Sequence, residues 1–228
     1  MSINLIIVGV GGLGREVLDY ANDTAKQTGQ FSIKGFLDDN PDALCNGNFN
    51  LSVPVIGDSY SYQVQDDDRF LVAVAEPDIR KSIVARLEAK GARFMSVVHP
   101  RAYVSPSASL GNGCMISPFA TVATNTKLGD HVVLGFYAHV GHDAIVGNYS
   151  ILSPYAAING NSVIGERGFL GTHAVITPGT TAGSSVQISA GSVLYSDVPN
   201  NRIAIGNPAK AGPRMPTLKP KDKVKIAS

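Results

Sequence analysis

The sequence predicts a small α/β domain with a parallel sheet, followed by a parallel β-helix. Two observations carry this prediction. The first hundred residues alternate between apolar runs typical of buried parallel strands and segments whose apolar residues recur at helical spacing. From Val104 onward, a large aliphatic residue instead recurs at every sixth position. The composition agrees, because 24 glycines, 16% charged residues and no tryptophan are typical of a turn-rich fold with an aliphatic core.

The elements of the first hundred residues follow one another as a βαβ alternation. Residues 3–8 form a continuous apolar run, which predicts a buried strand. The segment Gly9-x-Gly11-x-x-Gly14 comes next and opens a helix over 15–25. A second helix is predicted over 77–91, with proline near its start and glycine as its stop. Further strands are predicted over 33–37, 53–56, 70–75 and 94–98.

The six-residue repeat dominates the second half. Fifteen of the sixteen positions at this spacing from Val104 to Leu194 hold Leu, Ile or Val, and the exception is Ala182. Neither a helix nor a simple strand has a period of six, whereas three hexapeptides close one triangular coil of about 18 residues. The aliphatic side chains fill the prism, and the small residues four positions later fit its corners. The repeat runs without an insertion to about Pro199, which predicts roughly five coils.

Charge and cysteine content exclude several classes of protein. The formal net charge is +1, which provides no electrostatic basis for binding nucleic acid or a membrane surface. Cys45 and Cys114 are far apart, so we expect two reduced thiols rather than a disulfide or a metal-binding pair. The first residues lack the apolar core of a signal peptide, and no apolar run is long enough to span a membrane. We therefore expect a cytoplasmic protein.

The hexapeptide repeat, the glycine-rich loop of the α/β domain and the dipeptide His142-Asp143 together resemble the bacterial sugar acetyltransferases of left-handed β-helix fold. The resemblance implies a left-handed coil, a Rossmann-like first domain, and transfer of acetyl from acetyl-CoA to the amino group of a nucleotide-linked sugar in surface-glycan biosynthesis. It favours a UDP-linked 4-amino-4,6-dideoxy sugar and implies a homotrimer with active sites between subunits. On this match, residues 1–99 bind the nucleotide sugar, residues 100–210 bind acetyl-CoA, and residues 211–228 form a basic, disordered tail.

His142 is the candidate catalytic base. It stands two positions after the inward-facing Val140, so its side chain is expected to leave the prism. From the residues alone, a merely solvent-facing histidine explains this position equally well. Imidazole has a pKa near 6.5 and suits proton removal from an attacking amine at neutral pH. The resemblance makes His142 the general base and Asp143 the carboxylate that orients it.

The glycine-rich loop is the candidate phosphate site. Backbone N–H groups at a helix N-terminus attract anions, and Asp38 ends the second predicted strand, where a dinucleotide enzyme holds a ribose. A nicotinamide enzyme is nevertheless disfavoured, because the second mononucleotide half and a dehydrogenase domain are missing. A purely structural glycine turn stays open. The resemblance implies that the diphosphate is held by Gly11, Gly12 and Leu13, the nucleoside by Asp38 and Asp39, and the acceptor sugar near Ala75, where relatives often carry glycine.

The donor site is expected to be a groove between parallel coils, where the long pantetheine arm of acetyl-CoA bonds to backbone groups. Some relatives contact the donor with a second histidine nine residues after the base, but this chain has Ile151 there. The segment 206–210 also fits a simple end to the coil. The resemblance assigns donor binding to Gly160, Thr172, Ala190, Gly206, Pro208 and Lys210, the last of these against phosphate.

Three alternatives stand beside this assignment. A zinc enzyme needs ligands that converge from stacked coils, but the residues 18 positions after His131, His139 and His142 are not histidines, so we expect no metal. An O-acetyltransferase acting on sialic acid or another surface sugar would share the same sequence features. A non-catalytic protein that binds nucleotide sugars, or has a structural role, also stays open.

Overall fold

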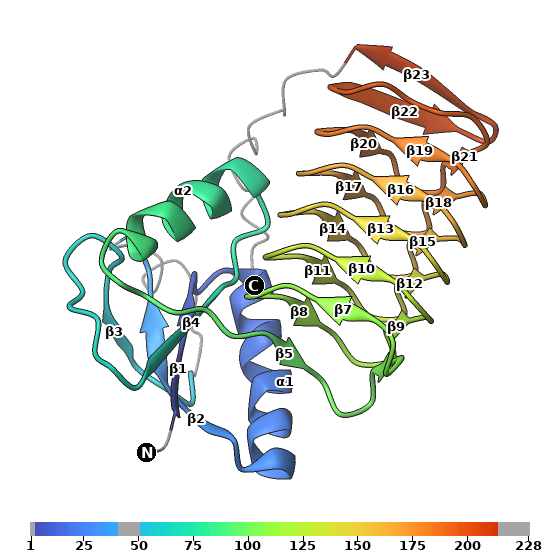
Figure 1. Ribbon diagram of the computed structural model, residues 1–228. Helices are drawn as coiled ribbons and strands as arrows, with labels where there is room; N and C mark the ends of the chain where they lie inside the picture. The colour runs from blue at the N-terminus through green and yellow to red at the C-terminus, as the bar shows by residue number, and fades with distance from the viewer. Residues whose placement is uncertain (1–2, 41–50, 214–228) are drawn as a thin grey trace, which may run out of the picture.

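The computed structural model describes residues 3–40 and 51–213 of the chain (Figure 1). Its N-terminal part is a four-stranded parallel sheet in the order β3-β2-β1-β4. The elements differ from the predicted ones mainly at their ends. Helix α1, for example, already begins inside the glycine-rich loop. They are β1 (Ile3–Val8), α1 (Gly12–Thr28), β2 (Phe31–Leu37), β3 (Val55–Gly57), β4 (Asp68–Val72) and α2 (Pro77–Glu88).

The two helices cover opposite faces of this sheet. Helix α1 buries Val17, Leu18 and Ala21, and its core also includes Val133 and Ile151 from the second half of the chain. It therefore lies between the sheet and the β-helix, as Figure 1 shows. Helix α2 packs on the other face through Ile83, Val84 and Leu87. Among the described helices, none is long and apolar enough to cross a bilayer.

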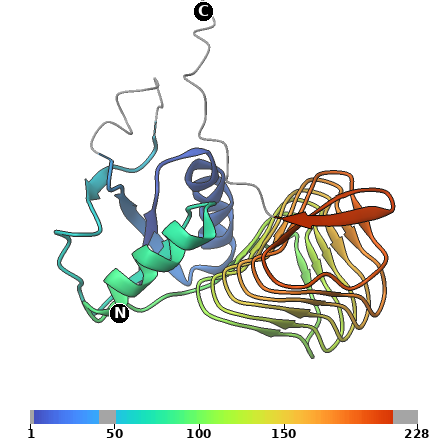
Figure 2. The ribbon, with the colours of Figure 1, turned by 90° about the horizontal axis from the view of Figure 1, so that it is seen from above.

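The second part is a parallel β-helix with a triangular cross-section (Figure 2). From β5 to β21, the paired strands are parallel and lie 18 residues apart, for example Val133 with Ile151. We name the three sides of the prism in the order in which the chain visits them. The first face contains β5 (Val97–Val98), β8 (Met115–Ile116), β11 (Val133–Leu134), β14 (Ile151–Leu152), β17 (Phe169–Leu170) and β20 (Gln187–Ile188).

The other two faces repeat the same arrangement. The second face contains β6 (Tyr103–Val104), β9 (Thr121–Val122), β12 (His139–Val140), β15 (Ala157–Ile158), β18 (Val175–Ile176) and β21 (Val193–Leu194). The third face contains β7 (Ser109–Leu110), β10 (Lys127–Leu128), β13 (Ile145–Val146), β16 (Val163–Ile164) and β19 (Thr181–Ala182).

The aliphatic residues of the repeat form the core of the prism. Val140, Leu152, Ile164 and Ile176 are all fully buried, and they belong to one continuous cluster. The predicted α/β domain followed by a β-helix is thus confirmed, and the hexapeptide pattern indicates the left-handed form. The sharp bends require an unusual backbone, since twelve described non-glycine residues, Asp143 among them, have φ between 55° and 62°.

Both ends of the β-helix differ from expectation in detail. The strand predicted over 94–98 is divided between two sheets. Phe94 forms a single bridge to Phe70 of the α/β sheet, whereas β5 pairs with β8 in the coil. An apolar run does not show which of two neighbouring sheets it will join.

The far end of the β-helix is closed by a hairpin. Strands β22 (Arg202–Gly206) and β23 (Ala209–Pro213) pair antiparallel and extend the first-face sheet. Residues 211–213 thus lie in a strand, and the rest of the expected basic tail lies outside the described residues.

Candidate active site

His142 and Asp143 lie at the corner between the second and third faces, just after β12. The two atoms His142 Nδ1 and Asp143 Oδ2 are 2.9 Å apart, and the side chains are 61% and 46% exposed. Asn125, one coil earlier, donates from Nδ2 to the other carboxylate oxygen of Asp143 at 3.2 Å. The bonds from His142 and Asn125 hold the pKa of Asp143 below its usual range. With Nδ1–H donated to the carboxylate, Nε2 is left as the proton-accepting nitrogen of an exposed ring, as a general base requires.

Gly160 explains how the imidazole is seated. This glycine follows β15, one coil beyond His142, and a Cβ at its position would overlap with His142 Nε2. The ring therefore rests on backbone that only glycine leaves free. Asn161 also donates its N–H to the carbonyl of His142 at 2.9 Å. The candidate base is thus held by backbone contacts from the next coil and by a carboxylate.

The glycine-rich loop divides its glycines between packing and open space. A Cβ on Gly14 would overlap with the carbonyl oxygen of Gly9, so Gly14 allows α1 to approach the sheet. Gly9 has φ +101° and lies close to the carbonyl of Ala73. Gly11 and Gly12, in contrast, have no atom within 4 Å of an added Cβ. A purely structural turn therefore explains Gly9 and Gly14. It does not explain Gly11 and Gly12, which lie at the start of α1, where no side chain caps the helix and an anion could bind.

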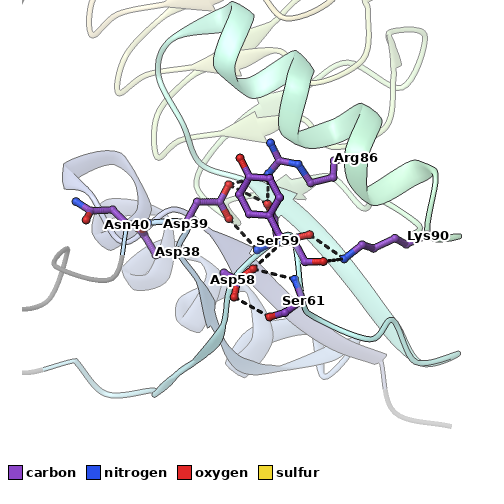
Figure 3. Close-up of polar contacts among 9 residues, drawn as sticks. Asp38, Asp39, Asn40, Asp58, Ser59, Ser61, Arg86 and Lys90 are labelled. Atoms are coloured by element: carbon purple, nitrogen blue, oxygen red, sulfur yellow. Dashed lines mark hydrogen bonds and ion pairs between the residues drawn. The ribbon is translucent and has the colours of Figure 1, made fainter.

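The carboxylates that follow β2 are bonded within the chain. Asp38 accepts the N–H of Val10 at 2.8 Å and that of Asn40 at 2.9 Å, so it ties the end of β2 to the glycine-rich loop. Asp39 accepts from the N–H and hydroxyl of Ser59 and from Arg86 Nη1, at 2.8 to 2.9 Å (Figure 3). A nucleoside at this edge would therefore meet carboxylates that already have partners.

Arg86 was missed by sequence reasoning. Its guanidinium carbon lies 3.6 Å from the ring centroid of Tyr60, while Nη1 contacts both Asp39 and Ser59. Lys90 donates to the backbone carbonyls of Ser59 and Tyr60 in the same cluster (Figure 3). A motif could not have indicated this cluster, because Asp39 and Arg86 are 47 positions apart and belong to different elements.

A pocket of about 170 Å³ lies between the start of α1 and the first face of the β-helix. It brings together Leu13 and Ala75, both predicted acceptor residues, with Ile151, the position where some relatives carry a second histidine. Phe169 and Glu16 also line it, and neither was predicted. Leu13, the first of these lining residues along α1, directly follows Gly12 in the chain.

Arg80 joins the two parts of the protein. Its side chain is fully buried and donates to the carbonyl of Val74 at 2.7 Å and to the carbonyl of Tyr149 at a coil corner. Burial lowers the pKa of Arg80 to about 10. Beside it, His131 is buried between the rings of Phe94 and Tyr149, at 4.9 and 5.1 Å between centroids. Burial lowers the pKa of His131 to about 4, so it packs as a neutral ring.

One chain does not gather all the predicted site residues. The α/β domain rests on the first face and on the corner between the third and first faces, where Tyr149 and Arg167 contact it. The corner that carries His142 is the one opposite the first face. Gly160 shares that corner with His142, whereas Thr172 and Ala190 lie at the corner between the first and second faces. Gly206, Pro208 and Lys210 lie in the terminal hairpin.

Among the described residues, neither a metal-binding group nor an exposed thiol accompanies the candidate base. Within residues 3–40 and 51–213, no group of three His, Cys, Asp or Glu side chains converges on a common point. Cys114 is buried and donates from Sγ to the carbonyl of Gly129 at 3.2 Å. Cys45 lies outside the described residues.

Comparison with known families and proteins agrees with this architecture. Residues 4–87 match the PglD N-terminal domain, and residues 125–160 match the bacterial transferase hexapeptide, six repeats. A UDP-N-acetylbacillosamine N-acetyltransferase of Bacillus subtilis (strain 168) is 31% identical over 116 residues, and this alignment spans half of each chain.

Solved structures align over nearly the whole chain. The acetyltransferase domain of PglB from Neisseria gonorrhoeae FA1090 is 34% identical, with a TM-score of 0.83, and the match covers 91% of this chain and 98% of that one. The same domain has been solved in complex with acetyl coenzyme A. PerB from Caulobacter crescentus, in complex with CoA and GDP-perosamine, is 30% identical with a TM-score of 0.82, covering 92% and 97% of the two chains. The chain therefore belongs to the hexapeptide-repeat sugar N-acetyltransferases that carry a PglD-type N-terminal domain.

Proposed function

We propose that this protein transfers acetyl from acetyl-CoA to the amino group of a nucleotide-linked amino-sugar, with His142 as general base. The observation that carries the proposal is the exposed His142–Asp143 pair, whose Nδ1–Oδ2 contact of 2.9 Å leaves Nε2, beside Gly160, as the proton acceptor. Membership of a sugar N-acetyltransferase family supports the donor and the type of reaction. We place the reaction in the cytoplasm, where acetyl-CoA and nucleotide sugars are available, as a step of surface-glycan biosynthesis.

The chemistry is direct acyl transfer. The sugar nitrogen attacks the thioester carbonyl carbon while His142 Nε2 takes a proton from that nitrogen. A backbone N–H stabilises the oxyanion, the C–S bond breaks, and the departing sulfur receives the proton from His142 as the thiol of coenzyme A. Asp143 keeps the imidazole in the tautomer that accepts at Nε2 and stabilises its protonated form. The buried thiol of Cys114 takes no part, so a covalent acyl-enzyme is not required.

The acceptor is expected to bind along α1. The uncapped start of this helix, with open space at Gly11 and Gly12, suits the diphosphate. The sugar then enters the pocket beside Leu13 and Ala75, whose walls are mostly apolar. Apolar walls favour a sugar with a methyl group at C6, which supports a 4-amino-4,6-dideoxy sugar. UDP is our first choice of nucleotide from the resemblance to the B. subtilis protein, and GDP is the second, from PerB.

A second copy of the chain is needed to complete this site. His142 lies at the corner opposite the first face, while the acceptor pocket lies on that face. We propose a cyclic homotrimer in which His142 of one subunit reaches the pocket of the next, with acetyl-CoA in the groove between them. This arrangement would also bring Gly160 of one subunit toward Thr172, Ala190 and the hairpin residues Gly206, Pro208 and Lys210 of its neighbour.

Thiol release from acetyl-CoA tests the reaction. The acceptors are UDP-, dTDP- and GDP-linked 3- and 4-amino-sugars and free sialic acid, with His142→Ala as the control enzyme. Rapid release with one nucleotide amino-sugar, reduced by about two orders of magnitude in the variant, is expected. Release with sialic acid alone would instead identify an O-acetyltransferase, and no release with any acceptor would refute the proposal.

Mixed oligomers test the shared site. His142→Ala and Gly12→Asp should each be inactive, because one lacks the base and the other places a carboxylate at the diphosphate site. Co-expression of the two chains should restore part of the activity, since some sites would combine an intact base with an intact acceptor domain. No restoration would show that both halves act within one chain.

A further inference from the structure

One ionisable side chain lines the acceptor pocket and has no role in the proposed reaction. Glu16 is the single titratable residue among the described residues that line this pocket. The remaining walls are mostly apolar, with Ser117 and Ser153 as the other side chains able to donate or accept. Glu16 is exposed in the single chain, so a ligand can reach it, and a sugar that fills the pocket would displace water from its carboxylate. A carboxylate that loses water is stabilised by a cation.

Glu16 is placed to contact the sugar of the acceptor rather than its diphosphate. Glu16 lies three residues after Leu13 on α1, so the two side chains share the helix face that is turned toward the β-helix. Gly11 and Gly12, where the diphosphate is expected, lie one turn earlier at the start of the helix. A sugar that extends from this diphosphate into the pocket therefore passes Leu13 first and Glu16 next.

Glu16 has no charged partner of its own in the described parts of the chain. None of the ion pairs there includes it, whereas Asp39, Asp68 and Asp78 each pair with a lysine or arginine. The described residues around the pocket donate no hydrogen bond to its carboxylate either. The carboxylate is thus available to a ligand.

We infer that Glu16 recognises the cationic amino group of the acceptor and so selects an amino-sugar over its hydroxyl counterpart. This inference rests on the proposed function and deepens it. A sugar amine is largely protonated at neutral pH, and a carboxylate–ammonium hydrogen bond is stronger than a bond between neutral partners. A hydroxyl in the same place would leave the carboxylate without a counter-charge. Glu16 is accordingly a specificity residue that acts on binding. The bound ammonium releases one proton to water to become the attacking amine, and His142 takes the second proton as the C–N bond forms.

Calorimetric binding to the full-length protein with CoA present tests the inference. The two ligands are the nucleotide 4-amino-sugar that gives thiol release and the same nucleotide sugar with a hydroxyl at C4. Wild-type protein should prefer the amine. Glu16→Gln keeps the shape of the side chain and should weaken amine binding by about tenfold while leaving binding of the hydroxyl compound unchanged. Asp19→Asn, on an exposed position of the same helix, is the matched control and should keep the wild-type preference.

The outcomes separate this inference from the proposed function. If wild-type protein releases thiol with the amino-sugar but Glu16→Gln binds it with unchanged affinity, the inference is wrong and the proposed function stands. An equal loss of affinity for both ligands would also overturn the inference, because Glu16 would then contribute to the shape of the pocket without distinguishing a charged amine from a hydroxyl. If wild-type protein neither binds nor acetylates any amino-sugar, the proposed function fails and the inference fails with it.

Discussion

Gly160 lies directly against the imidazole of His142, so that a Cβ at position 160 would overlap with Nε2. This relationship links a residue expected to bind the donor with the proposed base. Gly160→Ala should push the ring away from Asp143 and lower kcat by about tenfold or more, since misplacing a catalytic group by about 1 Å is costly. Steady-state kinetics measures the effect. Gly212→Ala, where an added Cβ meets nothing within 4 Å, is the control. Unchanged kcat in Gly160→Ala would mean that the ring can act from another position.

Asp143 should matter for turnover more than for binding. Asp143→Asn keeps the size of the side chain but removes the charge that receives Nδ1–H at 2.9 Å. The imidazole can then adopt the tautomer that carries its proton on Nε2, which does not accept a proton from the amine. We expect kcat to fall by about tenfold, with the KM for acetyl-CoA nearly unchanged, because the pair is partly exposed to water. A larger change in KM than in kcat would contradict this role.

Arg80 should stabilise the contact between the two parts of the chain. Arg80→Met keeps much of the side-chain volume but leaves the half-buried carbonyls of Val74 and Tyr149 without their donor. We expect the free energy of unfolding to fall by about 3 kcal/mol, measured by urea denaturation. Lys81→Met, at the exposed neighbouring position, should have little effect. Equal stability of the two variants would show that the carbonyls find other partners.

The buried His131 should make the free energy of unfolding fall in acid. Its pKa is about 4 in the folded protein and 6.5 in an exposed reference. Below pH 6.5 the unfolded chain therefore takes up a proton that the folded chain does not, so this contribution is complete above pH 6.5 and is lost as pH falls toward 4. The loss amounts to about 3 kcal/mol.

Thermal unfolding between about pH 7 and pH 4 measures this contribution. His131→Asn suits the test because asparagine tolerates the left-handed backbone that His131 adopts at φ 56°. The variant should be less stable at neutral pH, since it loses the stacking, but its stability should decline less steeply with acid. Parallel curves for variant and wild type would show that other groups cause the acid sensitivity.

The six-residue period could predict the β-helix because each coil repeats the same local requirement. One aliphatic side chain fills the prism and one small residue fits each corner, so the pattern in the sequence is the packing pattern itself, and Val140, Leu152 and Ile164 are buried as predicted. The α/β alternation was equally local, because strand and helix periods differ. The strand over 94–98 could not be assigned, since its apolar residues suit either sheet.

The candidate site was predicted only in part, for a related reason. His142 and Asp143 are adjacent in the chain, and Gly11 and Gly12 belong to a compact motif, so both pairs stand out in the sequence. The contact between Arg86 and Asp39 depends on how α2 packs across the sheet, and no spacing in the sequence indicates that packing.

The sequence by itself determined the two folding units, the inward-facing aliphatic residues and the dipeptide that supplies the candidate base, because each follows from residues close together in the chain. Only the tertiary structure decided where these parts meet. It placed Glu16, Ala75 and Ile151 around one pocket, and His142 at the corner opposite the first face on which that pocket lies. The physical reason is that the packing of α1 between the sheet and the coil depends on contacts between residues far apart in the chain, such as Val17 and Val133 in one core.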